Sequence, residues 1–97
     1  MIRLYLIDDH IVVREGLRAL LEANGHQVVG ETDEPTLALA EIAKLQPDVV
    51  LLDLNLGKRS GFEVLAEIER RKWNTRVVVL TMSSQPRNVA EALRMGA

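Results

Sequence analysis

Acidic side chains stand in this sequence at points where an apolar run ends. Asp8 and Asp9 follow the run that ends at Ile7, and Asp53 ends a run of valine and leucine, with Asn55 two positions on. Close carboxylates repel one another and stay ionised together only when a cation offsets their charge. Oxygen ligands of this kind favour a hard ion such as Mg²⁺, and a carboxylate beside it can attack phosphorus as a nucleophile. If the fold brings these residues together, they can support Mg²⁺-assisted phosphoryl transfer.

Each of these residues also has a simpler interpretation when it is taken alone. The pair Asp8-Asp9 could be a solvated turn that begins a helix, where acidic residues are favoured. Thr81, which follows the apolar run 76–80, is weak support because β-branched residues are common in strands. His10 could be a metal ligand or a phosphoryl relay, or simply a residue in the first turn of a helix. The combination of the acid pair with Asp53 and Thr81 at strand ends favours the functional interpretation.

The elements that must position these residues alternate short apolar runs with segments of helical period. Strands are predicted at 2–7, 27–30, 48–54 and 76–80. Helices are predicted at 12–23, from Pro35 to about residue 45, after Gly61 and at 86–95. The segments 57–61 and 81–85 are predicted to be loops. This alternation predicts an α/β fold, a parallel sheet with helices on both faces. In the flavodoxin-like order the first and third strands are neighbours where the strand order reverses, so the three carboxylates should converge there.

Apolar positions mark the surfaces that we expect to be buried. In the helices these are Val13, Leu17, Leu20 and Leu21, then Ala38, Ile42 and Leu45, then Leu65 and Ile68. The nearly all-apolar run 48–54 is expected to be buried on both faces, as is usual in a parallel sheet.

The composition narrows the classes of function. The 97 residues suit one domain, and the net charge of −2 argues against a nucleic-acid-binding surface. There is no cysteine, which fits a cytoplasmic protein, and no apolar run approaches the roughly 20 residues that span a bilayer. We expect a cytoplasmic protein with no membrane partner.

Taken together, these residues resemble the receiver domain of bacterial two-component response regulators, of the NarL/FixJ type. The matching residues are Ile7-Asp8-Asp9-His10, Val13-Arg14-Glu15-Gly16-Leu17, Asp53-Leu54-Asn55-Leu56, Gly61, Leu80-Thr81 and Ala92-Leu93-Arg94-Met95-Gly96-Ala97. The resemblance covers the whole chain and implies a flavodoxin-like (CheY-like) doubly wound parallel sheet.

The resemblance also implies a role for each site residue. Asp53 would be the phosphoacceptor and would bind Mg²⁺ directly together with Asp9, while Asp8 would act mostly through water. Asn55 would contribute its backbone carbonyl, and Thr81 would hydrogen-bond a phosphoryl oxygen as a switch. The phosphoryl donor would be a histidine kinase's phosphohistidine or a small acyl phosphate, and the protein would not be an enzyme beyond assisting its own phosphorylation and dephosphorylation.

The sequence departs from the family pattern in two places. The loop Leu56-Gly57-Lys58 replaces a Met-Pro-Gly-like run, and the chain stops at Gly96-Ala97. The family continues with a fifth strand bearing an essential lysine and a fifth helix, and the subfamily adds a DNA-binding helix-turn-helix. We therefore expect a C-terminally truncated receiver domain over residues 1–97, with strand order 2-1-3-4 and DNA contact only through an absent domain. Slow phosphorylation and self-association through the exposed fourth strand should follow.

Other functions remain open at this stage. A phosphorylation-independent interaction module with the receiver fold is the main alternative. A phosphatase similar to the haloacid-dehalogenase group is disfavoured, because Asn55 stands where those proteins have a general acid. A flavin or dinucleotide carrier is disfavoured because no glycine-rich loop follows the first strand.

Overall fold

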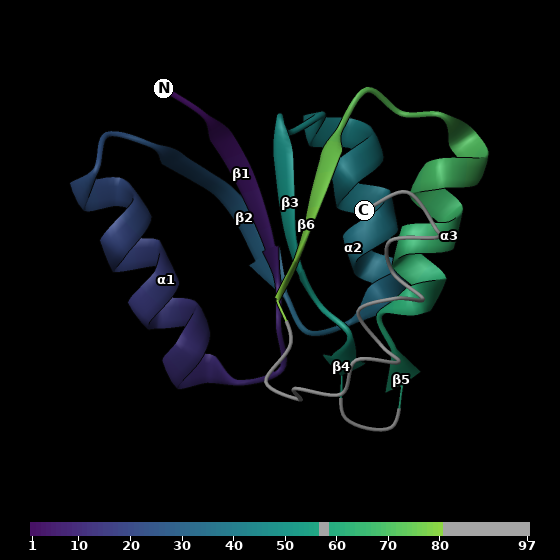
Figure 1. The fold of residues 1–97 in the computed structure, drawn as a ribbon, viewed down its shortest axis with the longest axis horizontal. Coiled ribbons are helices and arrows are strands. Elements are labelled where there is room, and N and C mark those ends of the chain that lie inside the picture. Colours follow the sequence, from purple (N-terminus) through teal and green to yellow (C-terminus); the bar gives the residue numbers. More distant parts are fainter. Residues whose placement is uncertain (57–58, 81–97) are drawn as a thin grey trace.

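The computed structural model describes residues 1–56 and 59–80 (Figure 1). Its elements in chain order are β1 (Arg3–Ile7), α1 (Ile11–Ala23), β2 (Gln27–Thr32), α2 (Pro35–Leu45), β3 (Val49–Asp53), β4 (Asn55–Leu56), β5 (Arg59–Ser60), α3 (Phe62–Arg71) and β6 (Arg76–Leu80). The predicted loop 81–85 and helix 86–95 lie outside the described residues. None of the helices within 1–56 and 59–80 is long and apolar enough to cross a membrane.

Four strands form the main sheet, in the order β2-β1-β3-β6, and every neighbouring pair is parallel. The predicted order 2-1-3-4 is therefore confirmed, with β6 as the fourth strand. The order reverses between β1 and β3, which run side by side in the centre of Figure 1. Their carboxyl ends lie together at that point, where doubly wound sheets place their ligands.

Within residues 1–56 and 59–80, helices cover the two faces of the sheet unequally. α1 lies on one side, while α2 and α3 lie together on the other (Figure 1). The continuous apolar core is on the α2 and α3 side and consists of Tyr5, Ile7, Ala38, Ile42, Val50, Leu52, Leu54, Leu56, Val64, Leu65 and Ile68. The predicted inward positions of the second and third helices are confirmed, since Ala38, Ile42, Leu65 and Ile68 are buried and Leu45 packs against the core.

The prediction for the first helix was wrong at one residue. Leu20 was expected to face the sheet, but it is 61% exposed, and α1 has no fully buried residue. Val13, Leu17 and Leu21 are half-buried, as expected of an inward face. The helix packs chiefly against β2, so it reaches only part of the sheet. Helical periodicity gives the direction of the apolar face but not the width of the surface that it meets.

The expectation that the third strand is buried on both faces was also wrong in part. Val50 and Leu52 are fully buried toward α2 and α3, whereas Val49 and Leu51 on the α1 face are only half-buried. On the neighbouring strand β6, Val78 is 46% exposed. The α1 side of β3 and β6 is therefore an apolar surface that remains partly open to solvent.

The segment predicted as a loop at 57–61 contains a short strand. β5 pairs with β4 as an antiparallel hairpin, in which Asn55 is opposite Ser60 and Leu56 is opposite Arg59. Each of these strands has only two residues, which is too short to show an alternation of apolar and polar residues in the sequence. Gly61 then ends the hairpin, and its N–H donates to the Leu54 carbonyl at 2.9 Å.

α2 shows why a helix begins where the sequence placed it. Pro35 occupies the first turn, where its missing N–H does no harm. The Glu34 carboxylate accepts from the N–H groups of Thr36 at 3.1 Å and Leu37 at 2.7 Å. At the other end Gln46 takes a left-handed conformation, and its N–H bonds the Ile42 carbonyl, which ends the helix. Both ends are thus capped by local hydrogen bonds.

Candidate functional site

The register of β1 against β3 brings Asp8 close to Asp53, the candidate phosphoacceptor. In the β1–β3 ladder Ile7 is the partner of Leu52, so Asp8 and Asp53 follow at the next position of each strand. Side chains alternate between the faces of a strand. Since Ile7 and Leu52 point into the core, Asp8 and Asp53 point to the opposite side. Both are nevertheless buried, with 3% and 1% exposure.

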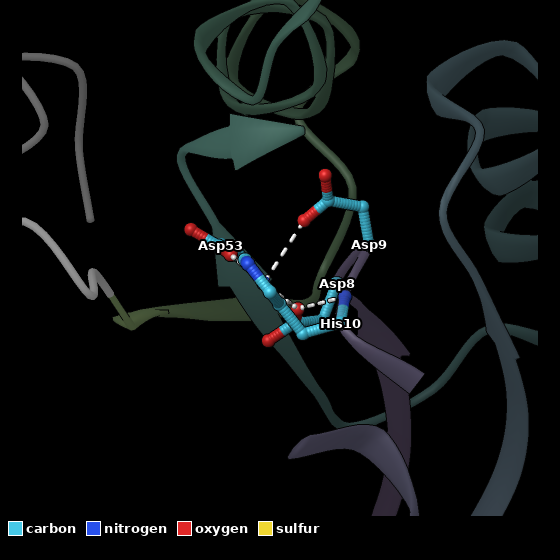
Figure 2. Close-up of side chains that lie close together, drawn as sticks. All are labelled: Asp8, Asp9, His10 and Asp53. Atoms are coloured by element: carbon cyan, nitrogen blue, oxygen red, sulfur yellow. Dashed lines mark hydrogen bonds and ion pairs between the residues drawn. The ribbon is translucent and has the colours of Figure 1, made fainter. Parts of the chain in front are cut away.

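Four potential ligand groups meet at this edge of the sheet. One carboxylate oxygen each from Asp8, Asp9 and Asp53 and a ring nitrogen of His10 all lie within 4.8 Å of one another. Figure 2 shows the four side chains converging, with Asp9 and His10 coming from the segment between β1 and α1. The predicted convergence of three carboxylates is confirmed.

His10 lies at the centre of the cluster. Its Nδ1 is 3.0 Å from Oδ1 of Asp8, 3.0 Å from Oδ1 of Asp9 and 3.6 Å from Oδ2 of Asp53 (Figure 2). The hydrogen bond to Asp8 and then the negative charge of Asp9 raise the pKa of His10 above its ordinary value. When it is protonated, the imidazole offsets part of the negative charge of the cluster.

The backbone around Asp8 is held from three directions. Its N–H donates to the Thr32 carbonyl at 3.1 Å, which continues the ladder with β2 by one residue. Its carbonyl accepts from Nη1 of Arg14 at 3.1 Å, and its Oδ1 accepts from the N–H of His10 at 2.8 Å. Arg14 also faces Glu31, at 3.8 Å from Nε to Oε1. The end of β1 is thus fixed to both α1 and β2.

The donor set fits a divalent cation. Three carboxylates in one cluster, two of them buried, are a costly arrangement without a positive charge beside them. Mg²⁺ is commonly held by one or two carboxylates and keeps several waters. Asp9 is partly exposed and His10 is half exposed, so the ion would reach the cluster from solvent.

The structure describes the other predicted site residues less completely. Asn55 begins β4 directly beyond the cluster, and the structure does not describe its side chain. Thr81 lies outside the described residues. His10 was favoured as a first-turn helix residue; the structure makes it the N-cap of α1 and also a member of the cluster. Its position next to Asp9 was the only signal that could have indicated this.

Two hollows in the described part of the chain lie away from the cluster. One is lined by Pro47, Trp73 and Thr75, and the other by Ile68, Trp73 and Val77. Pro47 and Thr75 precede β3 and β6, so these hollows belong to the amino ends of the strands. The acid cluster at the carboxyl ends of the strands is not part of either hollow.

Sequence comparison agrees with this fold. Residues 4–97 match the family described as "Response regulator receiver domain". The chain belongs to this family and is a receiver domain of the kind found in two-component response regulators.

Named relatives and solved structures are of the same type. The chain is 34% identical over 98 residues to the transcriptional regulatory protein YdfI of Bacillus subtilis, covering 100% of this chain and 46% of that protein. It is 36% identical over 93 residues to the nitrate/nitrite response regulator protein NarL of Escherichia coli, covering 95% and 43%. These relatives confirm the NarL-type resemblance, and the chain spans less than half of their length.

The fold is likewise that of receiver domains. A LuxR-family two-component response regulator from Aurantimonas superposes with a TM-score of 0.92 at 33% identity, covering 100% of this chain and 70% of that one. A LuxR-family DNA-binding response regulator from Staphylococcus aureus superposes with a TM-score of 0.93 at 26% identity, covering 100% and 82%. The flavodoxin-like (CheY-like) assignment is thus confirmed.

Proposed function

We propose that this domain is a phosphoacceptor in which Asp53 takes a phosphoryl group from a histidine kinase. The observation that carries the proposal is the placement of a buried Asp53 at the end of β3, facing Asp8 and Asp9, in a chain that belongs to the receiver family. Because receiver domains are signalling domains, the chemistry serves a switch and not the turnover of a substrate.

The site residues divide the binding of Mg²⁺ between them. Asp9 and Asp53 hold the ion directly, Asp8 acts through water, and Asn55 offers its backbone carbonyl. Bound there, Mg²⁺ offsets the charge of the carboxylates and of the phosphoryl oxygens. Thr81, which lies outside the described residues, hydrogen-bonds a phosphoryl oxygen and couples the site to its own loop.

The transfer exchanges one bond to phosphorus for another. An oxygen of the Asp53 carboxylate attacks the phosphorus of a phosphohistidine, a P–O bond forms, and the P–N bond breaks with its electron pair returning to the imidazole nitrogen. The fold contributes mainly by position, since the end of β3 is held rigidly against β1. A small acyl phosphate can act as donor in the same way, with its carboxylate as the leaving group.

The output is proposed to be transcriptional. Of the named relatives, YdfI is called a transcriptional regulatory protein, and the Staphylococcus aureus structure is called a DNA-binding response regulator. The chain matches less than half of YdfI and of NarL. We place this domain in the cytoplasm, as the signal-receiving part of such a regulator. DNA contact would come from a helix-turn-helix domain and not from the residues described here.

We further propose that the chain self-associates through β6. Within the described residues β6 ends the strand order, and its Val78 is 46% exposed. Apolar edge strands favour pairing with another chain. Light scattering over a concentration series should show dimers or larger species, and Val78→Lys should shift them to monomer. A monomer at every concentration for the unchanged chain would contradict this proposal.

Phosphoacceptance is tested by intact-mass measurement after incubation with Mg²⁺ and acetyl phosphate. A single labile phosphate is expected on the unchanged chain and on Asp33→Asn, whose aspartate is exposed and is not a member of the acid cluster. It should be absent from Asp53→Asn. Equal labelling of Asp53→Asn would place the phosphate on another residue and would contradict the proposal. No labelling of any version would favour a phosphorylation-independent interaction module instead.

A further inference from the structure

The imidazole of His10 is the one nitrogen donor in the acid cluster of the described chain. We propose that His10 Nδ1 is a direct ligand for first-row transition metals at this site, and that it determines which divalent ion the domain prefers. The proposal rests on the proposed function, because it takes the Mg²⁺ site of Asp9 and Asp53 as given. To the three carboxylates it adds His10 Nδ1 as a fourth donor, and to Mg²⁺ it adds transition metals as a second class of ion.

The geometry matches that of a ligand. Two donors at right angles, each about 2.1 Å from a metal, are about 3.0 Å apart. Nδ1 of His10 is 3.0 Å from Oδ1 of Asp8 and 3.0 Å from Oδ1 of Asp9. These three atoms are therefore spaced as neighbouring corners of one coordination sphere. Asp53 Oδ2, at 3.6 Å from Nδ1, closes the group with a small movement.

The ring is also held at the cluster by the backbone. The N–H of His10 donates to Asp8 Oδ1 at 2.8 Å, and the His10 carbonyl accepts from the N–H of Arg14 at 3.0 Å in the first turn of α1. These bonds fix the Cα of His10 next to the carboxylates. The ring is half exposed, and its Nδ1 already contacts the carboxylates of Asp8 and Asp9, so it faces the position that an ion would take.

Ligand chemistry then predicts a selective effect. Mg²⁺ prefers oxygen ligands and gives up its water reluctantly, so an added imidazole gains it little. Ni²⁺ and other borderline ions bind imidazole well, and their affinity for mixed nitrogen and oxygen sites follows the Irving–Williams order. A purely structural role of His10 would instead change the affinities for both ions together.

The experiment compares Ni²⁺ and Mg²⁺ affinities of the tag-free chain by calorimetry, with His10→Asn, His26→Asn and Asp53→Asn. Asparagine is a favoured N-cap residue, so His10→Asn keeps the start of α1. His26, the second histidine of the chain, lies at the start of β2 and is the matched control. We expect His10→Asn to lower Ni²⁺ affinity about tenfold or more while Mg²⁺ affinity stays nearly constant.

A direct readout comes from Mn²⁺ and pulsed electron paramagnetic resonance. Modulation from a coordinated nitrogen should appear in the unchanged chain and in His26→Asn, and should vanish in His10→Asn. Mn²⁺ bound without this nitrogen signal, or equal losses of Ni²⁺ and Mg²⁺ affinity in His10→Asn, would overturn the inference. If Asp53→Asn weakens Mg²⁺ binding in that case, the proposed function stands. If Asp53→Asn changes neither affinity, the ion binds elsewhere, and both the inference and the proposed metal site fail.

Discussion

Replacing Asp53 with asparagine should stabilise the protein when no divalent ion is present. The Asp53 carboxylate is 1% exposed and has ligand oxygens of Asp8 and Asp9 no more than 4.8 Å away. At that separation, with an effective dielectric constant of about 20, each like-charged pair repels by about 3.5 kcal/mol. The nearby His10 imidazole offsets part of this repulsion when it is protonated. A net gain of about 1–2 kcal/mol in the free energy of unfolding is the expected result for Asp53→Asn.

Saturating Mg²⁺ should reverse the order of stability. An ion that binds only the folded state stabilises it by about 2.7 kcal/mol at one hundred times its dissociation constant. The unchanged chain should gain this amount, whereas Asp53→Asn has lost a direct ligand and should gain much less. The crossing of the two stabilities is a sharper signature than either shift alone, because a change in packing would act equally with and without the ion.

Urea titrations at two Mg²⁺ concentrations measure both effects. The one tryptophan of the chain, Trp73, packs half-buried against the core and reports unfolding by its fluorescence. Asp33→Asn is the control for removing one negative charge from an exposed position. The reasoning is refuted if Asp53→Asn is the less stable protein without Mg²⁺, or if Mg²⁺ stabilises both proteins equally.

Three further substitutions test the supports of the site and the core. A Cβ added at Gly61 would lie 2.5 Å from the backbone oxygen of Asp53, so Gly61→Ala should lower both stability and the rate of labelling by acetyl phosphate; unchanged labelling would contradict this. Burial and then the hydrogen bond to Glu41 raise the pKa of Tyr5, so the folded state keeps a proton that the unfolded state loses. Stability should be unaffected by this group below pH of about 10 and should fall as pH rises above it, and Tyr5→Phe should remove that fall in alkaline urea titrations. Glu34→Ala removes the carboxylate that caps two N–H groups of α2 and should reduce the free energy of unfolding by about 1 kcal/mol, measured by the same titration.

The strand order and the acid cluster could be predicted because both follow from the alternation of apolar runs and helical segments along the sequence. Apolar runs separated by helical segments are enough to give a parallel sheet, and right-handed crossovers leave few possible orders. Once β1 and β3 are neighbours, the residues that follow them must meet. Asp8 and Asp53 were therefore placed correctly before any contact was known.

The features that could not be predicted from the sequence depend on how packed elements lie in space. The periodicity of apolar residues does not reveal this. Leu20 has the right phase to face the sheet, yet α1 packs chiefly against β2 and leaves it 61% exposed. The β4–β5 hairpin consists of two-residue strands, which are shorter than any repeat. The spacing of His10 does not distinguish a helix N-cap from a member of the acid cluster, and in the structure the residue is both.

The register between β1 and β3 joins the stability of this fold to its chemistry. Val50 and Leu52 fill the core on one face, and the alternation that buries them turns Asp53 to the other face, beside Asp8. A slip of one residue would turn Asp53 into the apolar core and Leu52 out of it, which would lose the burial of a leucine and desolvate a carboxylate among apolar groups. The apolar pattern of β3 therefore opposes a one-residue slip away from the register that completes the acid cluster. The same residues that make the strand stable are the reason that a strongly repelling set of charges can be held in one place.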